Sequence, residues 1–260
     1  MVAGWPKPRP GLPESYRRIY LEHSRANRGG LYRTTSLSQR LEEWMHRRVA
    51  ADVAQGAKGG SARPSSRPRS TLEIGAGTLN QLAYEPDVGP YDIVEPYSEL
   101  YLDAPGLARI RHVYADVAEI DPAARYDRIT SIATFEHIPD LPPVVARAAL
   151  LVADGGAMRV GIPNEGTPLW RLGTLVTGLE FRRRYGLDYQ VLMAYEHVST
   201  ADEIEAVLRL LFADVQRSVL GLNRYLGIYR FLVCRQPRRE AAHEVLGESS
   251  AAAATSGLRA

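Results

Sequence analysis

Two acidic residues and a pair of glycines are spaced to bind a ligand that carries a positive charge. The chain reads Glu73-Ile-Gly75-Ala-Gly77 at the end of a β-rich run, where glycines let the backbone approach a ligand closely. Glu95 ends the next β-rich run 18 residues after Gly77, the spacing at which a carboxylate binds the hydroxyls of a ribose. A carboxylate at Glu73 would repel a pyrophosphate and attract an ammonium group.

These acids favour one class of nucleotide ligand over another. Asn80 occupies the position at which the dinucleotide fingerprint requires its third glycine, which disfavours a nicotinamide oxidoreductase. A molecule with an adenosine at one end, an amino acid at the other and no phosphate satisfies both Glu73 and Glu95. We therefore expect S-adenosylmethionine as the cofactor and S-adenosylhomocysteine as the product. Taken alone, Glu95 or the later Asp116 could instead cap a helix or face solvent.

A histidine follows another β-rich run and could move a proton. Glu136 and His137 come directly after the run Arg128–Ala133. Transfer of the methyl group of S-adenosylmethionine to a hydroxyl or ammonium acceptor requires removal of a proton from that acceptor. The ordinary histidine pKa near 6.5 suits this task at neutral pH. His137 is therefore the first candidate for the catalytic base. The alternative is that His137 orders its loop by binding the backbone.

A long insertion, residues 163–199, separates the β-rich run Ala157–Ile162 from the next predicted helix. It is rich in aromatic side chains with polar tips, which can stack on a ring and also form hydrogen bonds. We expect it to form the acceptor pocket, with His197 and Tyr195 as further catalytic candidates and Glu196 beside them. It could also be a helical pair that packs on the sheet or forms a dimer face. Arg182–Arg184 could bind an acceptor phosphate or be a solvated helical face.

Alternating strands and helices are needed to bring these residues together. Such alternation predicts an α/β fold with a parallel sheet covered on both faces, closed by a final antiparallel hairpin. The predicted strands are Thr71–Gly75, Tyr91–Glu95, Ile110–Tyr114, Arg128–Ala133, Ala157–Ile162, Val215–Leu220 and Gly227–Arg235. The predicted helices are Leu12–Asn27, Ser36–Gln55, Leu79–Tyr84, Ser98–Leu102, Pro142–Val152 and Thr200–Leu211.

From Thr71 to about Arg235 the chain resembles the class I S-adenosylmethionine-dependent methyltransferases, in particular bacterial enzymes that act on small molecules and sugars. The matching segments, in order, are Glu73–Gly77, Tyr91–Glu95, Tyr114–Val117, Tyr126–Asp140 and Leu150–Gly156. The resemblance implies a Rossmann-like, mostly parallel seven-stranded sheet with helices on both faces and the last strand antiparallel. An N-terminal helical extension precedes it here.

The resemblance also implies which residues bind the cofactor. They are Glu73, Gly75, Ala76, Gly77, Glu95, Pro96, Asp116, Val117, Ala133 and Thr134. Glu73 and the glycine turn would hold the methionine moiety, and Glu95 the ribose hydroxyls. Asp116 would accept a hydrogen bond from the adenine amine near Pro96, while Ala133 and Thr134 would line the sulfonium side. Leu79 is a departure, because family members often carry a third glycine there.

Charge divides the 260-residue chain into two parts. Residues 1–70 hold 14 Lys and Arg against 5 Asp and Glu, a net charge of +9, while residues 71–260 have a net charge of −7. We expect an N-terminal helical extension or lid (1–55), a flexible basic linker (56–70), the methyltransferase domain (71–236) and a disordered tail (237–260). The tyrosines and arginines of the extension, Tyr16, Arg17, Tyr20, Tyr32 and Arg33, could fold over the cofactor. The basic part could instead be an arm for RNA or merely be solvated.

Composition limits the remaining possibilities. The longest apolar runs are too short to span a membrane, the start lacks a signal-peptide pattern, and the single Cys234 forms no internal disulfide, which together favour a cytoplasmic protein. The scattered histidines predict no metal site. We expect a small-molecule acceptor, neither a membrane nor a nucleic acid as partner, and a homodimer as one arrangement.

The expected reaction is methyl transfer to an oxygen or nitrogen of a small molecule, such as a sugar or glycosylated metabolite in natural-product or polysaccharide biosynthesis. Two alternatives stay open. One is an RNA methyltransferase that uses the basic N-terminal part. The other is a non-catalytic scaffold that binds the cofactor without turnover.

Overall fold

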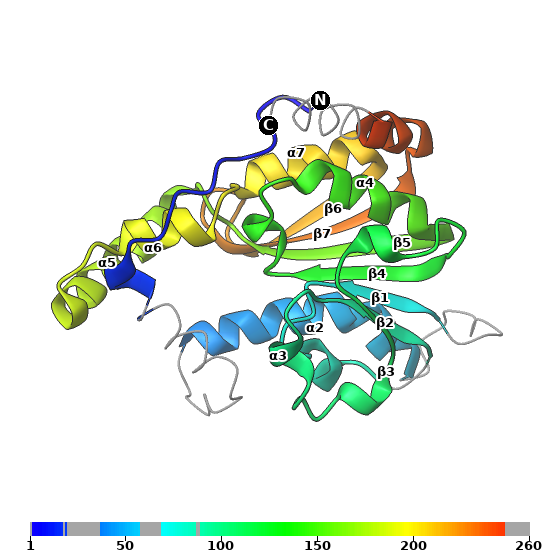
Figure 1. Cartoon of the computed structure of the whole chain (residues 1–260), viewed down its shortest axis with the longest axis horizontal. Helices are drawn as coiled ribbons and strands as arrows, with labels where there is room; N and C mark the ends of the chain where they lie inside the picture. Colours follow the sequence, from blue (N-terminus) through cyan, green and yellow to red (C-terminus); the bar gives the residue numbers. More distant parts are fainter. Residues whose placement is uncertain (1, 18, 20–36, 58–68, 87–88, 248–260) are drawn as a thin grey trace.

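The computed structural model describes residues 2–17, 19, 37–57, 69–86 and 89–247, and its centre is a seven-stranded sheet (Figure 1). The strand order is β3-β2-β1-β4-β5-β7-β6. Strands β1 to β5 pair in parallel, whereas β7 pairs antiparallel with both β5 and β6. The predicted fold class is therefore confirmed. The strands are β1 (Thr71–Ile74), β2 (Tyr91–Val94), β3 (Ile110–Tyr114), β4 (Tyr126–Ile132), β5 (Val152–Pro163), β6 (Phe212–Gly221) and β7 (Gly227–Pro237).

Helices α4 (Leu141–Leu151) and α7 (Ala201–Leu211) cover one face of the sheet (Figure 1). Helix α7 begins at a capping box, in which Thr200 and Glu203 satisfy each other's backbone amides. Its buried residues Ile204, Leu208 and Leu211 recur at helical spacing and join the main core. The capping box and the apolar stripe explain why this stretch forms a helix in the predicted place.

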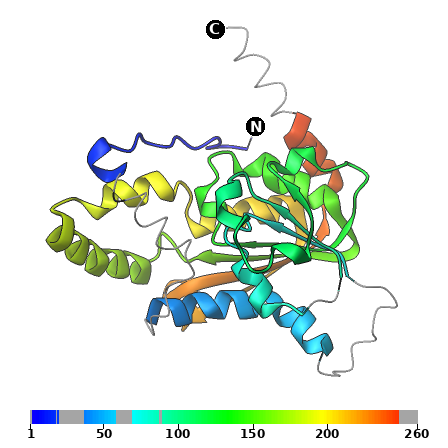
Figure 2. The same cartoon turned by 60° about the horizontal axis from the view of Figure 1, so that its bottom comes forward.

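Helix α2 (Leu37–Ala57) covers the opposite face (Figure 2). Buried arginines of the sheet form hydrogen bonds and ion pairs with this helix. The Arg128 guanidinium donates to Glu85 at 2.6 and 2.7 Å and to the carbonyl of Val49 at 2.9 Å. Arg159 donates to the same carbonyl at 2.7 Å, and Asp52 forms ion pairs with both arginines at 3.2 Å. These contacts make α2 a part of the sheet's core.

Short helical segments lie in the connections between strands β1 to β5. They are η1 (Asn80–Tyr84), α3 (Ser98–Tyr101), η2 (Leu107–Arg109), η3 (Val117–Glu119) and η4 (Phe135–His137). The predicted helix at Leu79–Tyr84 is a 3-10 turn, η1, because only a few residues separate the glycine turn from Pro86. Helix α2 covers the larger part of the sheet face opposite α4 and α7.

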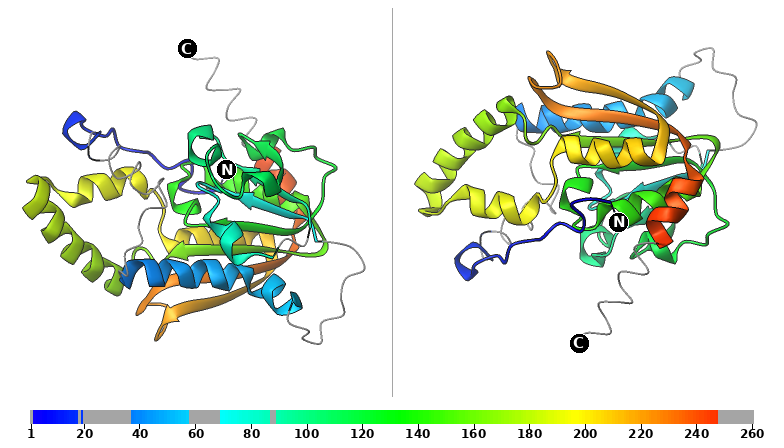
Figure 3. Two further views of the ribbon diagram at one scale, coloured as in Figure 1. Left: turned by 90° about the horizontal axis from the view of Figure 1, so that it is seen from below. Right: turned by 90° about the horizontal axis from the view of Figure 1, so that it is seen from above.

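The insertion forms two helices, α5 (Pro168–Tyr185) and α6 (Tyr189–Glu196), which extend away from the sheet (Figures 1 and 3). Residues near the N-terminus pack on them, since Tyr16 and Ile19 share a buried cluster with Phe181 and Leu192. The hydroxyl of Tyr16 also accepts from the amide of Asp188 at 3.0 Å. One end of the chain therefore supports the predicted acceptor insertion.

The prediction of a disordered tail over 237–260 is wrong for its first part. Residues 239–247 are helical, and Ala242 and Val245 are buried in the main core. Arg239 also donates to the carbonyls of Leu150 and Val152 at 3.1 Å. Residues 248–260, the linker residues 58–68 and residues 20–36, with Tyr20, Tyr32 and Arg33, lie outside the described residues. Within the described part, no helix has the length and apolarity needed to cross a membrane.

Candidate active site

The glycine turn lies directly after β1, against the loop that follows β4. Gly75 has a φ of +73°, and a Cβ built there would lie 2.2 to 2.8 Å from side-chain atoms of Thr134. Gly77 has a φ of +52°, and its Cβ would enter open space. The backbone conformation and the contact with Thr134 both require glycine at position 75. The open space beside Gly77 leaves room for a ligand at the carboxyl edge.

Glu95 joins the glycine turn to the segment after β2. Its carboxylate accepts from the amide of Gly77 at 2.8 Å and from the amide of Tyr97 at 3.1 Å. Burial raises the pKa of Glu95, although these two hydrogen bonds work in the other direction. The carboxylate is thus held at the turn, in the place that the sequence predicted for a ribose-binding acid.

Glu73 is placed differently from the position expected of an ammonium-binding acid. It alternates with Leu72 and Ile74 along β1, so its side chain points to the opposite face of the sheet, where the hydroxyl of Tyr91 donates to it at 2.8 Å. Burial raises the pKa of Glu73 to about 8, against the lowering effect of that bond. A carboxyl group that is buried and protonated at neutral pH stabilises the β1–β2 pair. Its contact with a methionine moiety stays a prediction.

The other predicted cofactor residues line the same edge. Asp116 is exposed and caps η3 by accepting from the amide of Ala118 at 2.8 Å, which leaves its second oxygen for a ligand. Val117 and Ala76 are buried, and Pro96 is exposed directly after Glu95. These residues follow β1, β2 and β3, which are neighbours in the sheet.

Two residues at this edge have left-handed backbone conformations without being glycine. Leu79 has a φ of 61° and Ala133 a φ of 48°. Leu79 stands where the related enzymes often carry a third glycine, and the structure keeps the conformation that a glycine would adopt. The buried side chain of Leu79 packs among the apolar residues around η1, which offsets a conformational cost of about 1–2 kcal/mol. The departure at Leu79 therefore preserves the turn.

Two of the predicted catalytic residues, His137 and His197, meet beside the loop after β4, where the two ends of the insertion come together. Nδ1 of His137 lies 2.7 Å from the carbonyl oxygen of Glu196, and Nδ1 of His197 lies 2.7 Å from Oε2 of Glu165. The two imidazole rings are edge to face with centroids 4.9 Å apart. Trp170, at the start of α5, stacks on His197 at 6.1 Å.

This cluster separates two protonation states. Burial and the neighbouring His197 lower the pKa of His137, so its ring is neutral at neutral pH. Burial opposes the charged form of His197 as well, but the hydrogen bond and charge of Glu165 outweigh it and raise the pKa of His197. Because a carbonyl only accepts, the proton of the neutral His137 ring is on Nδ1, and Nε2 carries a free lone pair.

A buried carboxyl group lies under the cluster. Burial raises the pKa of Glu136 to about 7, and its Oε1 is 3.8 Å from Nε2 of His137. Its other oxygen has no hydrogen-bond partner among the described residues, and the same holds for the buried hydroxyl of Ser199. The protonation of Glu136 can therefore be coupled to the protonation of His137.

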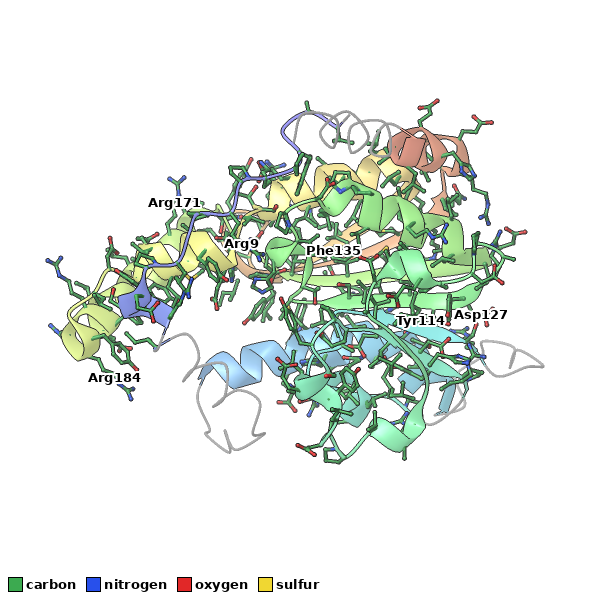
Figure 4. All side chains as sticks on the ribbon, viewed as in Figure 1. Arg9, Tyr114, Asp127, Phe135, Arg171 and Arg184 are labelled. Carbon is green, nitrogen blue, oxygen red and sulfur yellow. The ribbon has the colours of Figure 1, made fainter. Side chains whose placement is uncertain are left out.

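The N-terminal segment passes over this cluster, as Figure 4 shows for Arg9. The amide of Lys7 donates to the carbonyl of Pro139 at 2.7 Å, and the guanidinium of Arg9 donates to the carbonyl of His137. Arg9 also lies over the ring of Tyr195, with 5.5 Å to its centroid. The N-terminal segment thus contacts both the loop after β4 and the end of α6.

Sequence reasoning missed three partners in this site. Tyr91 binds Glu73, Glu165 binds His197, and Arg9 binds the backbone at His137. Glu165 had a detectable signal, because it follows β5 at the same carboxyl edge. Arg9 had none, since nothing in the sequence relates residue 9 to residue 137. Among the described residues, no group of His, Cys, Asp and Glu is arranged to hold a metal ion.

Comparison with known families agrees with this geometry. A family model described as a methyltransferase domain matches residues 36–209, which is more than half of the chain. The chain belongs to this methyltransferase family. It is a class I S-adenosylmethionine-dependent methyltransferase, with S-adenosylmethionine as its cofactor. The family match begins at the start of α2, in agreement with the packing of α2 on the sheet.

Solved structures share the fold of this methyltransferase at low sequence identity. The CurJ carbon methyltransferase is 19% identical with a TM-score of 0.56, and the alignment covers 85% of this chain and 61% of CurJ. A possible exported protein from Bordetella parapertussis is 15% identical, with a TM-score of 0.52 and coverage of 77% and 68%. The magnesium protoporphyrin IX methyltransferase from Synechocystis PCC 6803, with bound SAH, is 12% identical, with a TM-score of 0.50 and coverage of 85% and 94%. No curated protein matches the sequence.

The site residues fit the cofactor of the family. The open space beside Gly77 leaves room for a ligand on the turn, and the Glu95 carboxylate, bound to the amide of Gly77, is the group that would accept from ribose hydroxyls. Exposed Asp116 lies at the end of the neighbouring strand, where it can accept from an adenine amine. When bound, S-adenosylmethionine would supply an electrophilic methyl group, and Thr134 is one of the residues expected to line its sulfonium side.

Proposed function

We propose that this methyltransferase methylates an oxygen or nitrogen of a small molecule that binds between the β4 loop and the insertion. The observation that carries the proposal is the state of His137. Its ring is neutral, its Nδ1–H is bound by the carbonyl of Glu196, and its Nε2 is left to accept a proton. A hydroxyl or ammonium acceptor has to lose one proton, and Nε2 can receive it.

The surroundings of His137 support this role for proton transfer. Arriving positive charge at Nε2 is stabilised by the carboxyl group of Glu136, 3.8 Å away, and by Glu196. His197 is held by Glu165, and because its raised pKa favours the form that already carries a proton on both ring nitrogens, His137 is the better acceptor of the two. We assign His137 as the base, and His197 and Tyr195 to acceptor positioning.

We extend the proposal to a sugar or a glycosylated metabolite as the acceptor class. Trp170, which stacks on His197, and Tyr195, over which Arg9 lies, bring aromatic rings to this side, and Glu165, whose Oε2 binds His197, brings a carboxylate suited to sugar hydroxyls or amines. The resemblance to bacterial sugar-type enzymes and the single buried cysteine are consistent with a cytoplasmic enzyme of polysaccharide or natural-product assembly.

RNA is a weaker candidate for the acceptor. Described basic residues of the N-terminal part are already engaged within the chain: Lys7 pairs with Glu203, Arg9 with the His137 backbone, and Arg69 lies 3.8 Å from Asp52. A phosphate-binding arm needs such charges free. The geometry favours a cover over the acceptor side instead.

Turnover with radiolabelled S-adenosylmethionine and a panel of hydroxyl-bearing glycosides, amino sugars and RNA tests the proposal. We expect transfer to a glycoside or amino sugar, and loss of that transfer with His137→Gln. Cofactor binding by calorimetry without transfer to any acceptor would favour the scaffold. Methylation of RNA alone, weakening steeply with salt, would favour the nucleic-acid enzyme.

A further inference from the structure

Helix α5 exposes an unusually apolar side. Leu172, Leu175, Val176 and Leu179 are each exposed by 54 to 60% and recur at spacings of three and four residues. On a helix these residues form one stripe. Exposed apolar groups that cluster in this way mark an interaction surface more often than single exposed residues do.

The stripe does not belong to the packing between α5 and α6. The α6 side of α5 carries Gly178, whose built Cβ would lie 3.7 Å from Tyr189, and the buried Phe181. At 100° per residue, the stripe lies on roughly the opposite side of the helix from these two positions. It also lies away from the residues proposed to bind the acceptor.

The tip of the β6–β7 hairpin continues this surface. Leu222, Tyr225 and Leu226 are exposed by 87, 53 and 43%. The side chain of Asn164, just before α5, donates to the carbonyls of Arg224 and Gly227 at 2.9 Å and ties the tip to the start of the helix. Figures 2 and 3 show the hairpin on the side of α5 that faces away from α6. We call the stripe and the hairpin tip together the α5 face.

Positive charge surrounds the α5 face. The exposed arginines are Arg171 near the start of α5, Arg182, Arg183 and Arg184 at its end, and Arg224 at the hairpin tip. Figure 4 labels Arg171 and Arg184 near opposite ends of the projecting insertion. Glu180 is the one acidic residue in α5. An apolar stripe with a cationic border matches the boundary between headgroups and acyl chains of an anionic bilayer.

We infer that the α5 face docks on an anionic lipid bilayer, with α5 parallel to the membrane plane. The same charges oppose self-association. Antiparallel pairing of two α5 helices would place Arg182–Arg184 of one copy beside Arg171 of the other, and parallel pairing would place the two clusters together. This departs from the sequence-based expectation of no membrane partner, and it is independent of the proposed methyl acceptor.

Co-sedimentation with vesicles tests the inference without cofactor or acceptor. The full-length protein should pellet with vesicles of phosphatidylglycerol and phosphatidylcholine and stay in solution with phosphatidylcholine alone. The double variant Leu175→Asp/Leu179→Asp should weaken vesicle binding by more than about tenfold, because two charges replace apolar groups that would be buried in the bilayer. Three single variants, Arg182→Gln, Arg183→Gln and Arg184→Gln, should each weaken vesicle binding by about fivefold. This effect should be smaller at high salt, which screens the charges.

Leu210→Asp is the matched control, because Leu210 is an exposed leucine on α7, 39% accessible and outside the α5 face. It should bind vesicles like the wild type, and far-ultraviolet circular dichroism should show that all variants keep their helices. No pelleting of the wild type with anionic vesicles would overturn the inference. So would equal binding of the Leu175/Leu179 variant. A dimer in light scattering that the same variant dissociates, with no vesicle binding, would assign the face to a second copy instead.

Discussion

The rings of His137 and His197 meet edge to face at 4.9 Å, yet the pKa values of the two histidines are displaced in opposite directions. The cause is their different partners, since His137 binds a neutral carbonyl and His197 binds the carboxylate of Glu165. Two identical side chains are thereby given different tasks. The surroundings favour the neutral form of His137 and the protonated form of His197, which suits the roles of base and positioning group that we propose for them.

Replacing His137 with glutamine should lower kcat by about 10²- to 10⁴-fold, because the acceptor loses its proton-accepting group. Cofactor affinity should change little, since His137 follows the cofactor-lining residues. In the wild type, kcat should rise with pH through a pKa below the ordinary value of histidine and level off near neutral pH, because the base must be deprotonated. Stopped-time assays over pH measure this. A wild-type rate in the variant would make His137 a loop-ordering residue.

Replacing Glu165 with glutamine should destabilise the protein mainly at low pH. Since the folded-state pKa of His197 is raised, its pairing with Glu165 stabilises the fold fully below the pKa of an unfolded histidine and is lost as pH rises through the folded-state pKa. The expected loss is about 1.5–3 kcal/mol at acidic pH. Thermal unfolding of both proteins at about pH 6 and about pH 9 checks this. A difference that does not shrink at the higher pH would contradict it.

Gly75→Ala and Gly77→Ala form a matched pair. Both place alanine at positive φ, which costs about 1–2 kcal/mol. Only the Gly75 variant also drives a methyl group into Thr134. We expect it to lose markedly more stability and cofactor affinity than the Gly77 variant in urea unfolding and calorimetry. Adding Thr134→Gly should recover part of the stability loss of the Gly75 variant, and no recovery would refute the steric explanation.

Glu95→Ala should weaken S-adenosylmethionine binding by about 1.5–3 kcal/mol, because a ribose loses charge-assisted hydrogen bonds and the Gly77 amide loses its acceptor. Titration calorimetry measures the affinity directly. Glu95→Gln serves as the conservative variant and should show a smaller loss. Unchanged affinity in the alanine variant would remove Glu95 from the cofactor site.

Glu73→Gln should become more stable than the wild type as the pH is raised. The folded-state pKa of Glu73 is about 8 against an ordinary 4.5, so the wild type loses stability as pH rises between these values. Glutamine has no such penalty and still accepts from Tyr91. Urea unfolding at several pH values should show that the difference in unfolding free energy between the variant and the wild type widens up to about pH 8. A constant difference would mean that Glu73 is ionised in the fold, as an ammonium-binding acid would be.

Most of the sheet could be predicted because its strands are short β-rich runs and α7 has its own capping box. The glycine turn and Glu95 were also predictable, since both lie at the ends of neighbouring parallel strands. The surroundings of Glu73 were not. Its face of the sheet depends on the period-two alternation with Leu72 and Ile74, and its partner Tyr91 lies on the next strand.

Other features depend on contacts that a sequence does not display. The helix at residues 239–247 buries little more than Ala242 and Val245, so its pattern resembles a solvated tail. The cover over His137 depends on Arg9, which is distant in sequence. Left-handed backbone usually indicates glycine, but Leu79 adopts this conformation. Its side chain packs in an apolar cluster, a contact that glycine could not make.

Arg128 and Arg159 lie in the sheet, and both depend on α2 for the carboxylate of Asp52 and the carbonyl of Val49, while Arg128 also pairs with Glu85. A gene fragment that began at Thr71, where the recognisable motifs start, would encode a protein in which Arg159 loses its hydrogen-bond and ion-pair partners in α2 and, of the partners described for it, Arg128 keeps only Glu85. Shortened versions intended for crystallisation or NMR therefore have to begin before Leu37.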